Sequence, residues 1–197
     1  MRTIVFRSLP FIQDDLHRDF PKLRFSNWSV NSPYDTEYQC IAWAACNFNR
    51  RWWPWDDPSF YWPDGFVKRP VGTPIPVQEF AEMFEKKFGY EKCTKGEFEW
   101  GYQKVAIFAN LEGVTHMARQ RLFGDEWLSK LGCYEDIVHS KSVDIEGDID
   151  PTARQYGEVV QYMKRTWLRA AITMCLFRCM WMFLRLRIYR VVVPWEI

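Results

Sequence analysis

The sequence lacks the features that mark several classes of protein. None of its six cysteines forms a CxxC pair or the repeated short spacing of a structural zinc site. Its 26 Lys and Arg residues nearly cancel its 25 Asp and Glu residues, so we expect no nucleic-acid partner. Residues 1–20 contain only short apolar pieces broken by Arg and Asp, unlike a secretory signal. We therefore expect a cytoplasmic protein with reduced thiols, and delivery by a specialised secretion machine stays open.

Long hydrophobic runs are also missing, even in the apolar last thirty residues. The longest charge-free runs there, residues 170–177 and 179–184, are far shorter than the roughly 20 residues that a membrane span needs. A buried helix with a strand at residues 184–193 is the first interpretation of this extension. Contact with a membrane or a protein partner through residues 166–197 is the alternative.

What the chain does contain indicates a folded protein. Its 197 residues suit one domain, and its composition of 48% hydrophobic and 18% aromatic residues excludes an intrinsically disordered chain. We expect an α+β domain over residues 1–165, followed by the apolar, arginine-containing extension at 166–197. Hydrophobic periodicity predicts helices at residues 12–20, 38–48 and 76–89, and strands at residues 104–109, 114–122, 126–131 and 157–164.

Residues 50–76 form a Trp- and Pro-rich stretch, RRWWPWDDPSFYWPDGFVKRPVGTPIP. Its prolines forbid a helix or strand of ordinary length, so a long loop is expected. Long loops inside compact domains are often functional, and Trp and Tyr anchor binding surfaces. The loop is either a contact surface beside a cleft or an aromatic cover of the core, and the sequence leaves both open.

Cys40 and His116 are the candidate nucleophile and base. Asp35 and Thr36 are expected to cap the helix at residues 38–48, which places Cys40 in its first turn, where the helix dipole favours a thiolate. His116 is expected in the strand at residues 114–122, with Ala118 on its own side leaving room for the thiolate. The competing interpretation is that Cys40 is an ordinary buried residue.

A third residue that would orient the imidazole is sought among three candidates. Ser129 lies on the next predicted strand, and Asp136 and His139 follow in YEDIVHS. Position favours Ser129, while chemistry favours Asp136 or His139, and each also suits ordinary strand or loop polarity. Gln39 is a candidate oxyanion donor. A metal site made from Cys40, His116 and His139 has no support in the spacing, and we expect no metal or cofactor.

With these residues in place, the chain resembles an uncharacterised bacterial domain family. The resemblance rests on YQCIAWAA, RWWPW with YWPDGF, KVAIFAN, THMARQ, WLSKLG, EDIVH and YGEVVQYMKR, and it covers about residues 25–165. The family motifs read YNCIAWA, YWP, THAARQ and SKLG, so Gln39 replaces an Asn and Met117 an Ala. Its layout is similar to papain-like cysteine hydrolases of the NlpC type, which implies Cys40 as nucleophile and His116 as base.

The resemblance implies a thiol-dependent hydrolase of papain-like α+β architecture. Its substrate would be a peptide-like molecule with an amide or thioester bond, cleaved through Cys40, His116 and one of Ser129, Asp136 or His139. The alternative is a non-catalytic binding protein of the same fold that uses its Trp- and Pro-rich loop as the contact surface.

Overall fold

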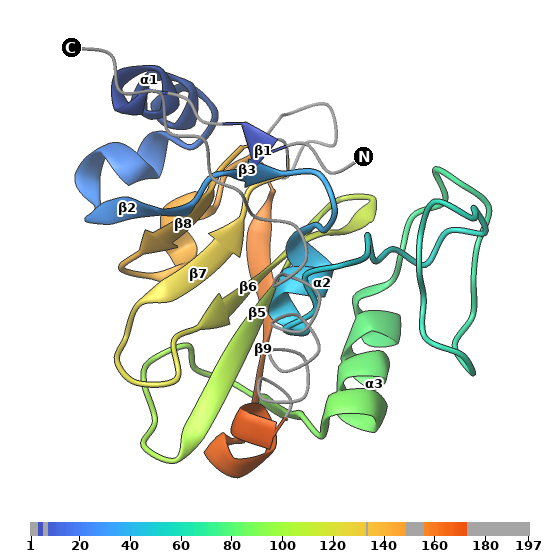
Figure 1. Cartoon of the computed structure of the whole chain (residues 1–197). Helices are drawn as coiled ribbons and strands as arrows, with labels where there is room; N and C mark the ends of the chain where they lie inside the picture. Colours follow the sequence, from blue (N-terminus) through green and yellow to red (C-terminus); the bar gives the residue numbers. More distant parts are fainter. Residues whose placement is uncertain (1–3, 6–7, 133, 149–155, 173–197) are drawn as a thin grey trace, which may run out of the picture.

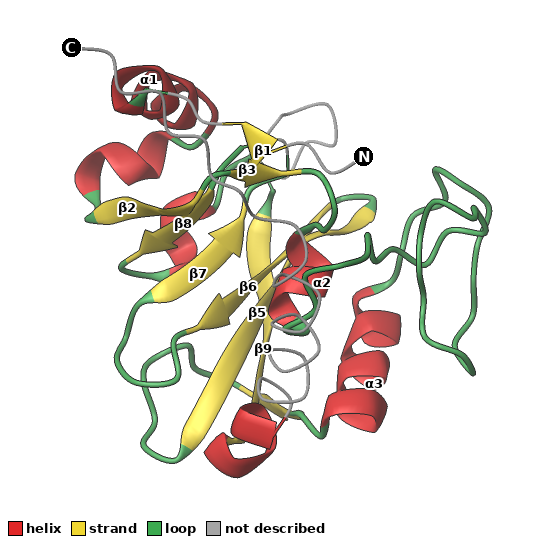
Figure 2. Ribbon diagram, viewed as in Figure 1, coloured by secondary structure: helices red, strands yellow, loops and turns green. Residues whose placement is uncertain are grey.

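An antiparallel sheet of seven strands forms the centre of the molecule, so the protein has an α+β architecture (Figures 1 and 2). The computed structural model describes residues 4–5, 8–132, 134–148 and 156–172. The strand order is β2-β8-β7-β6-β5-β9-β4. Its strands are β2 (Trp28–Ser32), β4 (Glu91–Cys93), β5 (Tyr102–Asn110), β6 (Gly113–Gln120), β7 (Trp127–Lys130), β8 (Asp136–His139) and β9 (Glu158–Thr166).

Helices cover both faces of this sheet. On one face lie α2 (Cys40–Ala44) and α3 (Val77–Phe88), and α2 packs directly on β6. On the other lie α1 (Leu9–Asp19) and the short 3-10 helices η1 (Pro21–Phe25) and η2 (Ser142–Ile145), whose apolar side chains join a second core cluster. A separate two-stranded pair joins β1 (Ile4–Val5) to β3 (Tyr34–Asp35). The sheet therefore separates two hydrophobic cores.

Alternation along β6 decides which side chains belong to which core. Residues paired directly across antiparallel strands share a face, and successive residues of a strand point to opposite faces. Met117 pairs with Ile107, and both lie in the core under α2 and α3. His116 pairs with Phe108, which lies in the core under α1. We call the face of the sheet that carries Met117 the cysteine face, and the face that carries His116 the histidine face.

The expected helix at residues 38–48 is much shorter in the structure. It begins at Cys40 and ends at Ala44, because the chain leaves the helix at Ala45 and Cys46 adopts a left-handed φ of 61°. Gln39 occupies the N-cap position without a side-chain cap. Asp35 does not cap the helix: it lies in β3 and accepts a hydrogen bond from the Glu37 N–H.

The loop that follows α2 has no regular secondary structure beyond two isolated bridges, Trp52 to Tyr61 and Trp55 to Arg69, as expected from its prolines. It is nevertheless held firmly. Arg69 forms a bidentate ion pair with Glu79 of α3. Trp52 and the following aromatic residues pack against the core of the cysteine face. The loop is therefore an ordered part of the fold.

The other elements follow the predictions in most places. The helix at residues 76–89 is confirmed as α3, which ends at Gly89 with a left-handed φ of 66°. The helix at residues 12–20 corresponds to α1, and the four predicted strands correspond to β5, β6, β7 and β9. The strands β2, β4 and β8 were not predicted. The interpretations that concern residues 173–197 lie outside the described residues.

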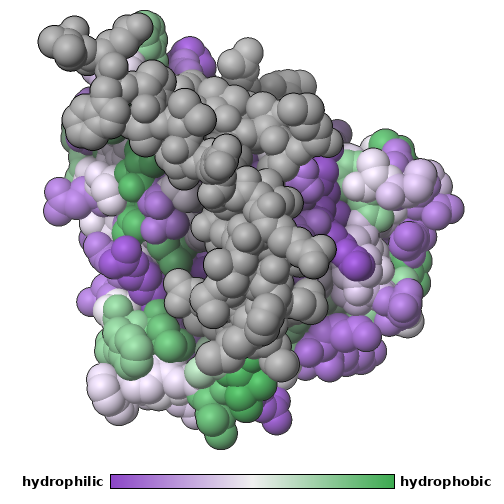
Figure 3. Space-filling model, viewed as in Figure 1, coloured by the Kyte–Doolittle hydropathy of each residue, from purple (hydrophilic) through white to green (hydrophobic). Residues whose placement is uncertain are grey.

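An exposed aromatic cluster marks one end of the sheet. Hydrophobic residues gather at the lower end of Figure 3, where a helical segment at residues 167–172 follows β9. The ring centroids of Trp100 and Trp167 are 4.4 Å apart, and Phe123 contacts Trp167. Within the described ranges, no helix has the length and apolar character needed to cross a membrane.

Candidate functional site

Cys40 lies on the cysteine face and is a buried, protonated thiol. Only 7% of its surface is exposed, and it belongs to the same core cluster as Met117. Burial raises the pKa of Cys40 to about 11, although the Met117 main chain and the nearby Lys130 ammonium act in the opposite direction. The dipole of the single-turn helix α2 does not offset the rise in the pKa of Cys40 that burial causes. At neutral pH the sulfur is a thiol and a weak nucleophile.

His116 lies on the histidine face in apolar surroundings. Its ring stacks on Tyr156 with centroids 4.1 Å apart, and Phe108 contacts its edge at 5.3 Å. The side chain is fully buried, and neither ring nitrogen has a hydrogen-bond partner within the described part of the chain. Burial holds the pKa of His116 well below its usual value, and the neighbouring His139 adds to this. The imidazole is therefore neutral.

The structure does not bring Cys40 and His116 together. Ala118 does lie on the side of His116, as the alternation predicts, but Met117 and not His116 faces the helix that carries Cys40. Met117, one position along the strand, lies on the side of Cys40 instead. The physical reason is that α2 packs on the opposite face of β6, so the backbone of the sheet stands between the thiol and the imidazole.

Ser129 and His139, two candidates for the third residue, contact each other instead of His116. Ser129 Oγ and His139 Nε2 are 2.9 Å apart, and His139 Nδ1 lies 2.7 Å from the Lys141 carbonyl oxygen. Because a carbonyl only accepts, Nδ1 carries the proton and Nε2 accepts from the Ser129 hydroxyl. Both side chains are fully buried, and burial lowers the pKa of His139 to about 4. This is a closed, satisfied polar pair.

Asp136, the remaining candidate, lies on the cysteine face. The hydroxyls of Tyr38 and Ser32 donate to Asp136 Oδ2 at 2.6 and 2.5 Å, and Lys130 Nζ lies 3.6 Å from Oδ1. Burial raises the pKa of Asp136 and lowers that of Lys130. Asp136 therefore belongs to a buried polar cluster near Cys40 and does not orient His116. Within the described residues, no three His, Cys, Asp or Glu side chains are grouped so as to hold a metal ion.

The expected oxyanion donor has a different partner. Gln39 Nε2 donates to the Trp52 carbonyl oxygen at 2.9 Å. The amide therefore fastens the start of the Trp- and Pro-rich loop to the start of α2. This hydrogen bond holds the start of the loop close to residues 36–37, which precede α2.

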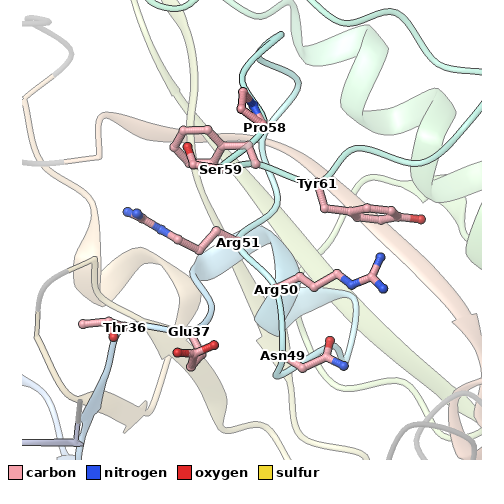
Figure 4. A pocket seen from close by; sticks show the side chains of 9 residues that line it. Thr36, Glu37, Asn49, Arg50, Arg51, Pro58, Ser59 and Tyr61 are labelled. Carbon is pink, nitrogen blue, oxygen red and sulfur yellow. The ribbon is translucent and has the colours of Figure 1, made fainter. Parts of the chain in front are cut away.

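A cavity of about 450 Å³ lies between this loop and the segment that precedes α2 (Figure 4). Arg50 and Arg51 come from the start of the loop and point in opposite directions, Arg50 toward Tyr61, while Glu37 comes from the segment before α2. The two guanidinium groups pack over aromatic rings of the loop, Arg50 over Tyr61 at 4.9 Å and Arg51 over Phe60 at 5.2 Å. The further lining residues are Thr36, Asn49, Pro58 and Ser59. The cavity thus combines stacked guanidinium groups with one carboxylate.

A second cavity of about 290 Å³ lies next to the first and shares three of its lining residues, Asn49, Arg50 and Tyr61. It extends toward Trp52 and toward Lys87 of α3. Arg50 therefore stands between two hollows of the same surface. The sequence signal that could have indicated this site is the pair Arg50–Arg51 immediately before WWPW, because charged residues beside a Trp-rich loop are typical of binding surfaces.

Of the comparisons with known proteins, only the comparison with protein families gives a match. No curated protein and no solved structure matches it. The model of one family, described as a domain of unknown function, matches residues 29–164. That range contains the sheet from Ser29 to Lys164, α2, the Trp- and Pro-rich loop and α3. The chain therefore belongs to the family of the domain of unknown function DUF7689.

Proposed function

We propose that the protein is a binding domain that recognises an acidic, peptide-like ligand through the cavity of its Trp- and Pro-rich loop. The observation that carries the proposal is the pair of guanidinium groups, Arg50 and Arg51, on the cavity wall. Within the described residues, neither has a carboxylate within ion-pair distance, whereas Arg18, Arg69 and Arg121 each have one. Two exposed cations beside a cavity favour an anionic group on the ligand.

The stacking of each guanidinium on an aromatic ring supports this proposal. A guanidinium attracted to the face of a ring still has N–H donors free to bind a carboxylate, which can accept two hydrogen bonds in one plane. The rings of Tyr61 and Phe60 therefore orient Arg50 and Arg51 before the ligand arrives. Prior orientation of long side chains reduces the entropy lost on binding.

Glu37 explains why a peptide suits the cavity better than a bare anion. Its carboxylate comes from the wall formed by the segment before α2 (Figure 4). A carboxylate can only accept hydrogen bonds, so it favours a ligand that also carries N–H donors. Peptide groups supply these donors next to acidic side chains. The bond from Gln39 to the Trp52 carbonyl and the Arg69–Glu79 pair keep the two walls in place.

The thiol-dependent hydrolase and the papain-like layout stay predictions of the resemblance. A cysteine hydrolase needs its base within hydrogen-bond reach of the thiol, about 3 Å. Here the candidate base lies on the other face of the sheet, and the thiol is protonated. These contacts favour the binding function over the hydrolase.

The proposal is tested by titrating acetyl-Glu-Glu-Glu-amide and its neutral analogue acetyl-Gln-Gln-Gln-amide while following the fluorescence of the loop tryptophans. We expect binding of the acidic peptide alone, weakened by added salt because exposed charges are screened. Replacing both Arg50 and Arg51 by Gln should reduce affinity by about tenfold or more, since charge-assisted hydrogen bonds contribute about 1.5–3 kcal/mol each. Equal binding of both peptides, or of neither, would refute the proposal.

A matched control separates the site from the overall charge. The double variant Arg24→Gln and Arg121→Gln removes the same two charges from exposed positions elsewhere. Arg121 loses only an exposed pair with Glu126, and such pairs contribute little to stability. The control should bind like the wild type.

A further inference from the structure

The exposed aromatic cluster at the end of the sheet belongs to neither hydrophobic core. It consists of Trp100, which is 75% exposed, Phe123, which is 65% exposed, and Trp167 between them. Leu168, the next residue of the helical segment after β9, is 71% exposed. Single exposed apolar side chains are normal, but a group of them marks an interaction site. The cavity of the proposed peptide site uses none of these residues.

Trp167 is the fixed centre of this cluster. Its ring centroid lies 4.4 Å from that of Trp100 and 4.9 Å from that of Phe123. Its indole N–H donates to the Tyr102 carbonyl oxygen at 2.8 Å, and its main-chain N–H donates to the Gly101 carbonyl oxygen at 2.8 Å. Both bonds attach Trp167 to the start of β5. Its ring therefore supports the two exposed rings from a position that the sheet holds.

The two exposed rings stand on tight changes of chain direction. Trp100 precedes Gly101, which has a φ of 89°, and Phe123 precedes Gly124, which has a φ of 103°. The planes of the Trp100 and Trp167 rings are 72° apart, and the three rings therefore form an uneven surface. A folded partner needs a complementary shape to pack on such rings. A fluid surface adapts to them.

The charge of the chain is unevenly distributed around this cluster. Residues 164–197 contain seven Lys and Arg residues and one acidic residue, whereas the whole chain has a net charge of +1. Beside the rings the charges are mixed, because Arg121 pairs with Glu126 and Lys164 pairs with Glu99. The positive excess therefore belongs to the stretch of sequence that begins at the cluster and continues beyond it.

We propose that the aromatic cluster docks the protein on the surface of a membrane that contains anionic lipids. Tryptophan and phenylalanine place their apolar rings at the boundary between lipid headgroups and acyl chains. Lysine and arginine residues near that boundary are attracted to anionic headgroups. The exposed rings of Trp100 and Phe123 and the positive charge of residues 164–197 match these two requirements. Contact of this kind needs no helix that spans the bilayer.

A second copy of this chain is the competing occupant of the cluster. In a symmetric dimer the same surface of both copies meets, so the positively charged stretches that begin at the two clusters would start at one interface. Like charges that face each other across an interface oppose association. Charge complementarity therefore favours an anionic lipid surface over a second copy.

Docking through this cluster leaves the peptide site open to solution. Figure 1 shows the helical segment at residues 167–172 at the lower end of the molecule, whereas the Trp- and Pro-rich loop projects on the right. Arg50 and Arg51 belong to that loop. The protein can therefore hold a peptide while it is bound to a membrane.

Flotation of the full chain with lipid vesicles tests the proposal. One vesicle type contains phosphatidylcholine alone, and the other contains equal parts of phosphatidylcholine and phosphatidylglycerol. We expect binding to the anionic vesicles, weakened by added salt, and much weaker binding to the neutral ones. The double variant Trp100→Gln and Phe123→Gln should bind the anionic vesicles about tenfold more weakly or less, because two apolar rings are lost from the contact.

A matched control removes two exposed rings from another part of the molecule. Phe11 of α1 is 72% exposed and Phe25 of η1 is 91% exposed. The double variant Phe11→Gln and Phe25→Gln should bind vesicles like the wild type. Circular dichroism checks that both double variants are folded. Leu168→Gln leaves both turns intact and should also weaken vesicle binding, which keeps the test decisive if the first variant unfolds.

Three results would overturn the proposal. They are the absence of binding to the anionic vesicles, equal binding to both vesicle types, and unchanged binding by the folded Trp100→Gln and Phe123→Gln variant or by Leu168→Gln. Sedimentation equilibrium examines the competing occupant: a wild-type dimer that this double variant abolishes, without vesicle binding, would assign the cluster to a second copy. The Arg50→Gln and Arg51→Gln variant should bind vesicles normally, so the peptide site and the membrane contact are tested separately.

Discussion

Cys40 and His116 lie on opposite faces of the sheet, with β6 between them. Cys40, the first residue of α2, belongs to the same core cluster as Met117, and His116 stacks on Tyr156 on the other side of the sheet. Adjacent residues of a strand point to opposite faces of the sheet. Met117 therefore faces the thiol of Cys40, and the imidazole of His116, one position earlier, faces away from it. A rotamer change cannot join them, because the imidazole would have to cross the hydrogen-bonded strands.

The first prediction concerns the reactivity of the cysteine. Cys40 is 7% exposed with a pKa of about 11, so at neutral pH it should react slowly with iodoacetamide. Cys93, which is half-buried, should react first although burial also raises its pKa. Mass spectrometry of tryptic peptides after timed labelling measures both rates. Preferential labelling of Cys40 below neutral pH would instead reveal an activated thiolate.

The second prediction concerns the uncharged nitrogens of His116. Among the residues that the structure describes they have no hydrogen-bond partner, and leaving such buried groups unpaired costs about 1–3 kcal/mol. His116→Phe should therefore leave the free energy of unfolding unchanged or raise it, because a phenyl ring can also stack on Tyr156. Urea unfolding monitored by circular dichroism measures this.

His139→Phe is the contrasting variant for that experiment. It removes the hydrogen bonds to Ser129 and to the Lys141 carbonyl and leaves the Ser129 hydroxyl buried without its acceptor. We expect a loss of about 1–3 kcal/mol. If His116→Phe destabilised the protein as much as His139→Phe, His116 would have a polar partner that the structure does not show.

The third prediction is a loss of stability in mild acid. Burial depresses the folded pKa of His139 from 6.5 to about 4 and that of His116 well below 6.5. Below pH 6.5 the unfolded chain therefore binds protons that the folded protein does not. The free energy of unfolding should fall by about 1.4 kcal/mol per pH unit for each histidine as the pH drops from 6.5 toward 4.

Asp136 acts in the opposite direction, because burial raises its pKa from 3.8 and the folded protein then binds a proton that the unfolded chain does not. Urea unfolding at several pH values measures the slope. The slope should be smaller in His116→Phe by about the contribution of one histidine. A stability that is independent of pH between 6.5 and 5 would show that neither imidazole is buried as a neutral group.

The fourth prediction concerns the contact between the loop and the β5–β6 turn. Gly113 has a φ of 132°, and an added Cβ atom would lie 2.4 Å from the Ile75 carbonyl oxygen. Gly113→Ala should cost more than about 2 kcal/mol, because backbone strain adds to this clash. Gly72→Ala, with a φ of 82° but open space around it, should cost about 1 kcal/mol. Thermal unfolding compares the two, and equal costs would contradict the contact.

Local patterns in the sequence predicted much of the fold. Alternation correctly placed His116 and Ala118 on one side of a strand, and the apolar stripe with Gly89 at its end predicted α3. The short strands β4 and β8 were not predicted, because three or four residues are too few to show the alternation of apolar and polar side chains that marks a strand. The loop was predicted as a loop, but its cavity depends on the distant contact from Gln39 to Trp52.

The candidate site could not be predicted to the same extent. Alternation shows which residues share a face, but it does not show which face a helix will cover. Cys40 and His116 were therefore paired by analogy, and packing on the other side of β6 separated them. Ser129 and His139 were both identified, yet as alternatives, because their contact depends on the register of β7 and β8.

The central claim is that the loop cavity, and not the Cys40 thiol, is the functional site. The most direct measurement compares the affinity of acetyl-Glu-Glu-Glu-amide for the wild type, Cys40→Ser, and the double variant Arg50→Gln and Arg51→Gln by isothermal titration calorimetry. We predict that Cys40→Ser binds like the wild type and that the arginine variant loses about tenfold or more in affinity. Unchanged binding by the arginine variant, with binding lost in Cys40→Ser, would contradict the account.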